Sequence, residues 1–475
     1  MAVDNTNQSA QVPEPMQAEV IRLLEDAVKA GASDVHIAIE NNRAVVQFRV
    51  HGVVVEFGEI EPGLCQELMQ AVFNMSDTGD ATYNAFGYSS GRISQGALKL
   101  PSQVETIRLQ FNPLANYGRY LVMRLLYRSP PFGARDLSRF GFTKYQQRQM
   151  RRLRATPTGL IILAGPTGSG KSTSTRINLE MLFTERRGEQ TVLSVEDPPE
   201  APIRGVRQIP VTSARGADDR RTKFDEAIIA ALRSDPDVIM IGEIRDFESG
   251  NLATQAAMTG HQVWSTLHAL DAMSIPNRLR DLGIDPYKIY DPSIMTGMWA
   301  QRLVKKLCPH CRIPFKQAVA EGKYDPDFVN MVSTVLNPNE YEMYARGPGC
   351  VKCTRGVTGR IPVAEIIMPD QRMMNYLRDG DSGTARAYWT QKLHGFTMHD
   401  HALTHVARGI IAPEEYEALL GPMRPPSNPA YIAKLKKSKG ATDARPAAEK
   451  ATEQAAEKPA EGEQTDGEAI TEPAE

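Results

Sequence analysis

The sequence lacks several features that would place it in other classes of protein. No apolar run approaches the roughly 20 residues that a membrane-spanning helix needs, and residues 1–19 lack the basic start and apolar stretch of a signal peptide. The formal net charge is only −2, so bulk charge gives no support for nucleic-acid binding. These absences predict a cytoplasmic protein whose contact with a membrane is peripheral.

Cysteine is also scarce, with five in 475 residues. Four of them form two C-x₂-C pairs, Cys308/Cys311 and Cys350/Cys353, while Cys65 stands alone. In a reducing compartment such pairs indicate metal binding before disulfides, because four thiolates can close a tetrahedral Zn²⁺ site. The 38 residues between the pairs exceed the usual zinc spacing, so the fold has to bring them together. We expect Cys65 to be a core thiol.

The N-terminal part of the chain predicts a small α+β domain. Ala18–Ala30 has apolar side chains at helical spacing and is stopped by Gly31. Segments rich in β-forming residues follow at 45–55 (a strand pair that turns at His51–Gly52), 104–111 and 120–126. We therefore expect a disordered N-terminus over residues 1–15 and a folded domain over 16–127.

A linker rich in Pro and Gly, 128–137, precedes a region in which strand and helix patterns alternate. This alternation predicts a parallel sheet covered by helices, an α/β domain over residues 138–421. The expected strands are 159–164, 191–195, 238–241 and 262–267, and the expected helices are 171–183, 224–233 and 247–258. Residues 422–475 predict a disordered acidic tail, whose short lysine cluster is a candidate contact for a partner or a lipid surface.

A glycine-rich loop follows the first expected strand of the α/β domain and fits G-x-x-x-x-G-K-[ST]. Its residues are Gly165, Pro166, Thr167, Gly168, Ser169, Gly170, Lys171, Ser172 and Thr173. The glycines let backbone N–H groups turn toward phosphate oxygens, and the helix that follows adds its positive end. Lys171 would neutralise the β- and γ-phosphates, the Ser172 hydroxyl would ligate Mg²⁺, and Thr173 would reach the α-phosphate side. The loop and its flanks predict a site for ATP and Mg²⁺.

Two expected strands end in carboxylates, at the edge where a parallel sheet binds ligands. Strand 191–195 runs into Glu196, and strand 238–241 runs into Gly242 and Glu243. Hydrolysis needs an oriented water and a group that takes its proton, and these acids are the candidates. His261 and His268 bracket a third short strand, and histidine can donate to a phosphate or orient a neighbour near neutral pH.

Four of these segments, in this order, resemble the secretion ATPase superfamily. It includes the type II secretion and type IV pilus motors and the related type IV secretion and conjugation ATPases. The segments GPTGSGKST, VEDPPE, LRSDPDVIMIGEIRD and TGHQVWSTLHALDA are similar to its Walker A, Asp box, Walker B and His box. Residues 32–36 and 48–52 are similar to motifs of its N-terminal domain, so the resemblance covers about residues 18–420.

The resemblance implies a fold and a working assembly. The fold would be α/β overall, with a PAS-like α+β N-terminal domain followed by a RecA-like P-loop ATPase domain. The chain would form a homo-hexamer with nucleotide between the two domains, and ATP hydrolysis would move an inner-membrane platform or secretion-channel partner. The protein would associate with the inner membrane peripherally, through these partners, and direct nucleic-acid binding is not expected.

Residue roles also follow from the resemblance. Glu196 would polarise the water, Glu243 would lie near Mg²⁺, and His261 and His268 would sense the γ-phosphate.

Three arginines match positions from which the N-terminal domain of the family supplies guanidinium groups to the nucleotide. Arg108 and Arg124 are the better matches, and Arg119 is a neighbouring one whose alignment is ambiguous by one position. A guanidinium at such a place would stabilise charge that develops on the leaving phosphates.

The assembly-type motors of the family carry a tetracysteine insertion that retraction-type motors usually lack. A zinc subdomain over residues 302–365 is therefore implied, and with it assembly or secretion. One departure is His51, which stands where the family often has the aspartate of Arg-x-Asp-Gly. Another is the short segment ahead of residue 18, which favours a leaner type IV pilus, conjugation or Dot/Icm-like ATPase over a full-length type II motor.

Two other functions stay open at this stage. One is a nucleic-acid-handling ATPase of RecA or helicase type, although the sequence offers no surface of interleaved basic and aromatic residues. The other is a nucleotide-gated scaffold that does not hydrolyse ATP. The presence of Lys171 and the two glutamates argues against it. His399, His401 and His405 suggest a metal cluster, but their segment is similar to a helical stretch of the family without a metal role, so we expect structural histidines.

Overall fold

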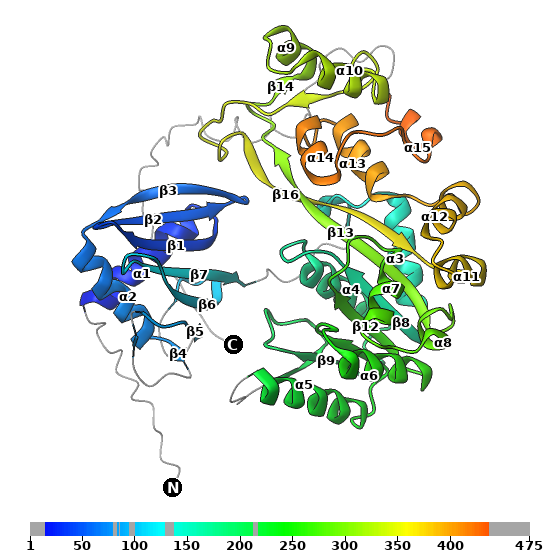
Figure 1. The fold of residues 1–475 in the computed structure, drawn as a ribbon, viewed down its shortest axis with the longest axis horizontal. Coiled ribbons are helices and arrows are strands. Elements are labelled where there is room, and N and C mark those ends of the chain that lie inside the picture. The colour runs from blue at the N-terminus through cyan, green and yellow to red at the C-terminus, as the bar shows by residue number, and fades with distance from the viewer. Residues whose placement is uncertain are drawn as a thin grey trace, which may run out of the picture.

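The computed structural model describes residues 15–78, 83–84, 86–94, 100–128, 137–211 and 217–436. Two domains lie side by side, and a small subdomain sits at the far end of two long strands of the larger domain (Figure 1). The expected disordered N-terminus and linker fall mostly outside the described residues, at 1–14 and 129–136.

A seven-stranded antiparallel sheet forms the N-terminal domain, in the order β3-β2-β1-β7-β6-β5-β4. The elements are α1 (Pro15–Lys29), β1 (Ala32–Glu40), β2 (Arg43–Val50), β3 (Val53–Ile60), α2 (Pro62–Asn74), β4 (Asp77–Thr78), β5 (Ser89–Ser94), β6 (Val104–Pro113) and β7 (Arg119–Tyr127). Because side chains alternate along a strand, Val35, Ile37 and Ile39 of β1 face the buried core that α1 and α2 share. The opposite face of the sheet is polar.

The structure confirms the expected helix, the strand pair that turns at His51–Gly52, and the two later strands. The turn has positive φ at both His51 and Gly52, as the two-residue hairpin turn requires. Strands β1, β4 and β5 and helix α2 were not expected from the sequence. Strand β1 escaped notice because Asp34 and His36 break its apolar pattern, although both side chains are buried.

The larger domain contains a second seven-stranded sheet, in the order β10-β9-β11-β12-β8-β13-β16. All neighbouring pairs are parallel except β13 with β16. Its first elements are η1 (Leu137–Phe140), α3 (Lys144–Ala155), β8 (Gly159–Ala164), α4 (Lys171–Glu185), β9 (Val192–Glu196), β10 (Arg207–Pro210), α5 (Ala217–Leu232), β11 (Val238–Ile241), α6 (Phe247–Met258), β12 (Gln262–Leu267), α7 (Ile275–Asp281) and α8 (Pro286–Ile289). All four expected strands and all three expected helices are confirmed.

Alternate residues of the central strands bury into cores on the two faces of this sheet. Leu160 and Ile162 of β8 belong to one apolar cluster, and Ile161 and Leu163 belong to the other. A strand buried on both faces has to be apolar throughout, which is why the run 160–164 was readable from sequence.

Strands β13 (Met295–Leu307) and β16 (Val357–Ile367) extend beyond the sheet and carry the small subdomain (Figure 1). The subdomain's own elements are β14 (Ile313–Pro314), α9 (Phe315–Ala320), α10 (Pro326–Val335) and β15 (Tyr344–Ala345). The helices that follow β16 are α11 (Gln371–Arg378), α12 (Ser382–Gln391), α13 (Met398–Ala407), α14 (Pro413–Leu420) and α15 (Pro429–Ala433).

The prediction of disorder from residue 422 onward is wrong for residues 422–436. Met423 and Ile432 are buried in the apolar cluster formed by α13, α14 and the subdomain, and α15 lies within this stretch. Two well-placed apolar side chains anchor a segment whose average composition is polar. The rest of the expected tail, 437–475, lies outside the described residues. Among the helices of the described ranges, none has the length and apolar character needed to cross a bilayer.

Candidate active site

The phosphate loop connects the carboxyl end of β8 to the first turn of α4. Helix α4 begins at Lys171, and Gly170 precedes it with φ 85°. Gly165 has no room for a side chain, because a Cβ there would lie 2.4 Å from the main-chain oxygen of Gln301. The Ser172 and Thr173 side chains are exposed at the helix start, where hydroxyls can meet a phosphate or its cation. The backbone and side chains therefore fit a bound nucleoside triphosphate.

The Lys171 side chain folds over the loop. Its Nζ donates to the carbonyl oxygens of Gly165 at 2.6 Å and Pro166 at 3.2 Å. Burial lowers the pKa of Lys171, and the charges of Glu243 and Glu200 oppose this shift. The lysine thus lies within electrostatic reach of acids from two neighbouring strand ends.

Glu196 is the last residue of β9 and is only 8% exposed. Its Oε1 accepts hydrogen bonds from Ser194 Oγ at 2.7 Å and Gln208 Nε2 at 2.8 Å. These two donors fix the carboxylate at the phosphate edge of the sheet.

Glu243 follows β11 and is held on both of its oxygens. His268 Nε2 lies 2.9 Å from Oε1, and Arg245 Nε donates to Oε2 at 2.9 Å. The His268 partner comes from the loop directly after β12, the next strand of the sheet. The structure therefore brings Lys171, Glu243 and His268 to one edge.

His261 is not part of this edge, which corrects the expectation that both histidines face the γ-phosphate. It precedes β12, and its main-chain oxygen accepts from Gly159 N at the start of β8. With His268 at the other end of the strand, seven residue steps place the two about 23 Å apart. The His261 ring instead contacts Ala256 O and Thr259 Oγ1 at the end of α6.

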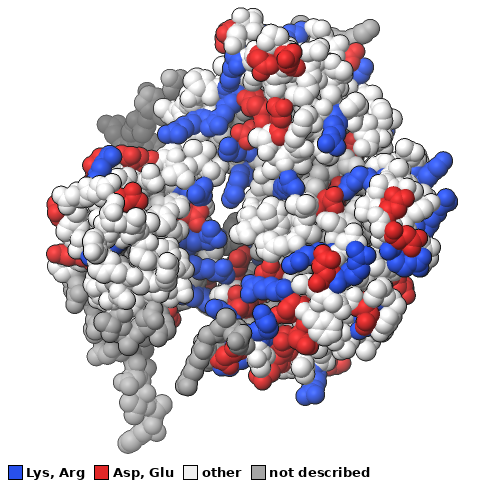
Figure 2. Space-filling model, viewed as in Figure 1, with Lys and Arg blue, Asp and Glu red and all other residues white. Residues whose placement is uncertain are grey.

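Arg108 reaches from the N-terminal domain to the loop after β9. Its guanidinium donates to Pro198 O at 3.3 Å and lies 3.5 Å from Glu200 Oε1. Arg124 stands directly opposite Arg108 on β7 and pairs with Asp34 at 2.8 Å. Figure 2 shows Lys and Arg side chains gathered along the hollow between the two domains.

The register of the N-terminal sheet places five charged residues in one row across five strands, on its polar face. The row consists of Arg49, Asp34, Arg124, Arg108 and Arg92. Burial raises the pKa of the single acid, Asp34, but hydrogen bonds from Arg124 and Ser33 outweigh it and leave that pKa below its usual value. Arg119 lies outside this row, over the ring of Phe86 at 5.2 Å, so the structure separates it from the other two candidates.

Comparison with known proteins decides the family. The family model described as "Type II/IV secretion system protein" matches residues 9–418. The type II secretion system ATPase E of Vibrio cholerae serotype O1 is 34% identical over 394 residues, which cover 83% of this chain and 73% of that protein. The chain belongs to the type II/IV secretion system protein family. Together with the phosphate loop, this membership makes it a secretion and pilus-class ATPase.

Further relatives of this secretion ATPase fit the same assignment. The type IV pilus assembly ATPase PilB of Thermus thermophilus is 29% identical over 413 residues, which cover 85% of this chain and 44% of PilB. Among solved structures, the Legionella pneumophila ATPase DotB superposes with a TM-score of 0.56 at 19% identity, covering 88% of this chain and 99% of that one. The pilus retraction motor PilT, solved with bound ADP, gives 0.52 at 20% identity, covering 84% and 96%. These likenesses show a shared fold, and the mixed α/β domain with its parallel sheet is consistent with a RecA-like ATPase.

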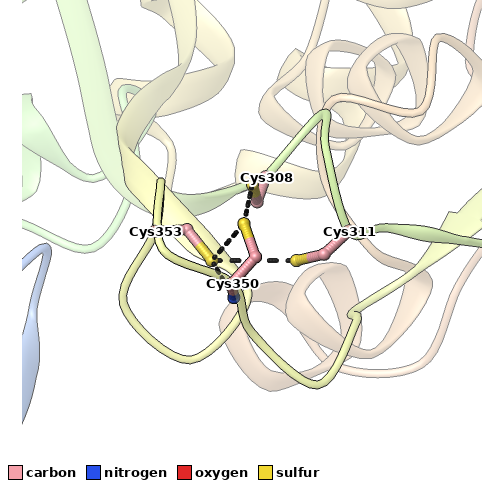
Figure 3. Close-up of side chains that lie close together, drawn as sticks. All are labelled: Cys308, Cys311, Cys350 and Cys353. Atoms are coloured by element: carbon pink, nitrogen blue, oxygen red, sulfur yellow. Dashed lines mark hydrogen bonds between the residues drawn. The ribbon is translucent and has the colours of Figure 1, made fainter.

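The four paired cysteines of the secretion ATPase converge at the tip of the β13–β16 ribbon (Figure 3). All four Sγ atoms lie within 4.8 Å of one another, and the Sγ–Sγ distances are 3.8 Å for Cys308–Cys350 and 3.7 Å for Cys311–Cys353. Four thiolates placed tetrahedrally about 2.3 Å from one zinc ion would be about 3.8 Å apart. The cluster thus fits zinc. His310 between the first two cysteines is exposed and outside the group.

Cys65 and the C-terminal histidines have structural roles, as expected. Cys65 is fully buried on α2, and burial raises the pKa of its thiol to about 11. His401 Nδ1 accepts from Ala364 N at 3.0 Å while its Nε2 contacts Gly141 O at 2.9 Å. His405 Nε2 lies 3.1 Å from Pro362 O, and His399 Nδ1 lies 2.6 Å from Tyr416 Oη.

The buried histidines predict an acid-sensitive ATPase domain. Burial lowers the pKa of His405 to about 4 and the pKa of His401 well below its usual value. In the unfolded chain these histidines are protonated below about pH 6.5, whereas the native state holds them neutral. The native state therefore has its full stability above that pH and loses it as the pH falls toward 4. The loss amounts to about 3 kcal/mol for His405.

We expect His405→Gln to flatten the fall in unfolding free energy between pH 7 and pH 5. Urea unfolding followed by tryptophan fluorescence measures it, since all three tryptophans, 264, 299 and 389, belong to this domain. His394→Asn, at an exposed position with φ 52°, is the control and should leave the slope unchanged. An equal slope in His405→Gln and the native chain would contradict the prediction.

Sequence reasoning missed several side chains that organise the site: Asp34, Arg49, Arg92, Arg245 and Gln301. Asp34 and Arg245 lie inside motifs that were recognised, so their polarity was a usable signal. Arg49 also lies inside a recognised motif, residues 48–52, but its place beside Asp34 depends on the strand register, and Arg92 lies outside the motifs altogether.

Proposed function

We propose that this secretion ATPase hydrolyses ATP at the phosphate loop to power pilus assembly, protein secretion or conjugative transfer. One juxtaposition carries the proposal: Lys171 lies within electrostatic reach of Glu243 and Glu200, and Arg108 of the N-terminal domain lies 3.5 Å from the same Glu200. A scaffold that only binds nucleotide has no need for carboxylates fixed at the edge where water would attack.

The contacts favour a division of labour between the two acids that differs from the one implied by the resemblance. Glu243 is one of the acids whose charge acts on Lys171, and it is 22% exposed at its side chain. Glu196 is more deeply held, between Ser194 and Gln208. We infer that Glu243 orients the attacking water and accepts its proton, while Glu196 fixes the water network around the cation. His268 positions Glu243.

The phosphates would be held by loop amides, Lys171 and the Thr173 hydroxyl, and Ser172 would ligate Mg²⁺, which neutralises charge on the phosphate oxygens when bound. Water attacks the γ-phosphorus, the bond to the β–γ bridging oxygen breaks, and ADP leaves. Arg108 and Arg124 would stabilise the negative charge that builds on the departing oxygens. When Arg124 turns from Asp34 to the nucleotide, Asp34 would still have Arg49 as a partner, whose Nε lies 3.8 Å from its Oδ2.

The assembly and location belong to the same proposal. The chain would act as a homo-hexamer at the cytoplasmic side of the inner membrane, against a platform or channel protein, with the N-terminal domain as a PAS-like unit that closes over the nucleotide. The cysteine subdomain would hold one structural Zn²⁺, which favours pilus assembly or secretion over retraction.

The proposal is tested by ATP turnover of the purified full chain. We expect Mg²⁺-dependent phosphate release that single-stranded DNA does not stimulate, and its loss in Lys171→Ala, which removes the charge that faces the phosphates. Lys144→Ala, which removes an exposed lysine at the start of α3, is the matched control. Stimulation by DNA would instead favour a nucleic-acid-handling ATPase, and binding of ATP without turnover would favour a scaffold.

A further inference from the structure

Gln301 lies behind the phosphate loop, on a strand that contains none of the four recognised motifs. It is 1% exposed, in the middle of β13. The residue before it, Ala300, pairs with Ala164, the last residue of β8, so Gln301 stands level with the start of the loop at Gly165.

The side-chain amide of Gln301 bonds to both sides of the loop's last turn. Its Nε2 donates to Ser169 O at 2.8 Å, and its Oε1 accepts from Ser174 Oγ at 2.9 Å. Its main-chain oxygen lies against Gly165, so a Cβ added to Gly165 would be only 2.4 Å from that oxygen. One residue therefore contacts the loop at its beginning, at its end and on the first turn of α4.

These contacts set the direction of a backbone donor. In a trans peptide the C=O of one residue and the N–H of the next point to opposite sides. Holding the Ser169 carbonyl toward β13 therefore turns the Gly170 N–H to the other side, toward the concave face of the loop. Ser174 is fixed from behind as well, since its carbonyl accepts from Asn178 Nδ2 at 2.8 Å.

We propose that Gln301 is a positioning residue for ATP binding, one that sets the phosphate loop in its anion-binding form before nucleotide arrives. The inference rests on the proposed ATP site. An amide suits the task, because it donates to a carbonyl and accepts from a hydroxyl at once without placing a charge beside the phosphates. A carboxylate lacks the donor, and an apolar side chain leaves two buried polar groups unpaired.

The experiment measures the dissociation constant of a fluorescent ATP analogue and the unfolding free energy for the full chain and its variants. We expect Gln301→Met to weaken analogue binding about tenfold to a hundredfold. Gln301→Glu should weaken it at least as much, because the new carboxylate repels the phosphates. The defect should appear as a raised KM at nearly unchanged kcat, since Gln301 touches no reacting atom.

Gln262→Met is the matched control. Gln262 is also 1% exposed and also lies on a strand paired with β8, but its Nε2 donates to Leu153 O and Thr156 O at the opposite edge of the sheet. Both variants should lose stability, and only Gln301→Met should lose affinity. Equal affinity in the native chain and Gln301→Met would overturn the proposal, as would an equal loss in Gln262→Met.

If Gln301→Met fails to fold, Ser174→Ala tests the same contact from the helix side. It removes the hydroxyl that holds Oε1, and we expect a severalfold weaker binding; unchanged binding would overturn the proposal. An inability of the native chain to bind the analogue would instead count against the proposed function, so the two failures are distinguishable.

Discussion

Replacing Glu243 by glutamine is expected to leave ATP bound and to lower its turnover about 10²–10⁴-fold, the usual contribution of a general base. Glutamine has nearly the shape of glutamate, so the contact with Arg245 can be kept through the amide oxygen. It cannot accept a proton from water. Removing one negative charge near Lys171 also strengthens the local positive field, so the affinity for ATP should hold or rise. Single-turnover phosphate release and equilibrium binding of an ATP analogue separate the two effects.

Glu196→Gln is the informative comparison, because it makes the same chemical change at the neighbouring strand end. Ser194 and Gln208 donate hydrogen bonds to Glu196 Oε1, and the amide oxygen of a glutamine can accept both of them. We expect turnover to fall less in Glu196→Gln than in Glu243→Gln. The reverse order would assign the base to Glu196, as the family resemblance implies. Full turnover in both variants would show that neither glutamate is needed for hydrolysis.

Removal of the metal from the cysteine cluster is expected to unfold the small subdomain while the ATPase sheet stays folded. Structural zinc contributes about 10–16 kcal/mol of binding free energy in small zinc-binding peptides. The strands β14 and β15 of the subdomain have only two residues each, so apart from the apolar cluster that it shares with α13 and α14, the metal is its main source of stability. We expect about one zinc per chain by elemental analysis of the purified protein.

Cys353→Ser tests the metal directly, since a serine hydroxyl is a poor zinc ligand. It should lose the metal and make the segment between β13 and β16 sensitive to protease, while tryptophan fluorescence of the ATPase sheet is retained. Cys65→Ser is the matched control, a buried thiol of the other domain, and should keep the zinc. A native protein free of zinc, or a Cys353→Ser variant that keeps it, would contradict the assignment.

The parts of the fold that were predictable are those in which local sequence leaves one solution. Strand β8 is apolar at every position because both faces are buried, and the loop after it needs glycines and a lysine in fixed order. The acids Glu196 and Glu243 were found for a related reason: in a parallel sheet, the residue after a strand lies at the ligand edge. The same rule, applied to the residue before a strand, would have placed His261 at the far edge.

The parts that were not predictable depend on pairings between distant segments. The row from Arg49 to Arg92 exists only through the register of five strands. Gln301 is 132 positions from its partner Ser169, and nothing in its neighbourhood along the chain distinguishes it from an ordinary core amide. The packed stretch 422–436 was missed because average composition hides two anchoring side chains, Met423 and Ile432.

The paired strands β13 and β16 run from the level of the phosphate loop to the cysteine cluster, with one register shift between Lys306 and Leu307. The ladder runs from Met298 paired with Ile367 to Leu307 paired with Val357, and Cys308 follows at once. The seven residue steps from Gln301 to Cys308 span about 23 Å. If the ladder moves as one piece, a tilt of about 10° at the loop end would carry the tip of the subdomain about 4 Å over that length. A partner bound to the tip would then be displaced when nucleotide binding tilts the loop end.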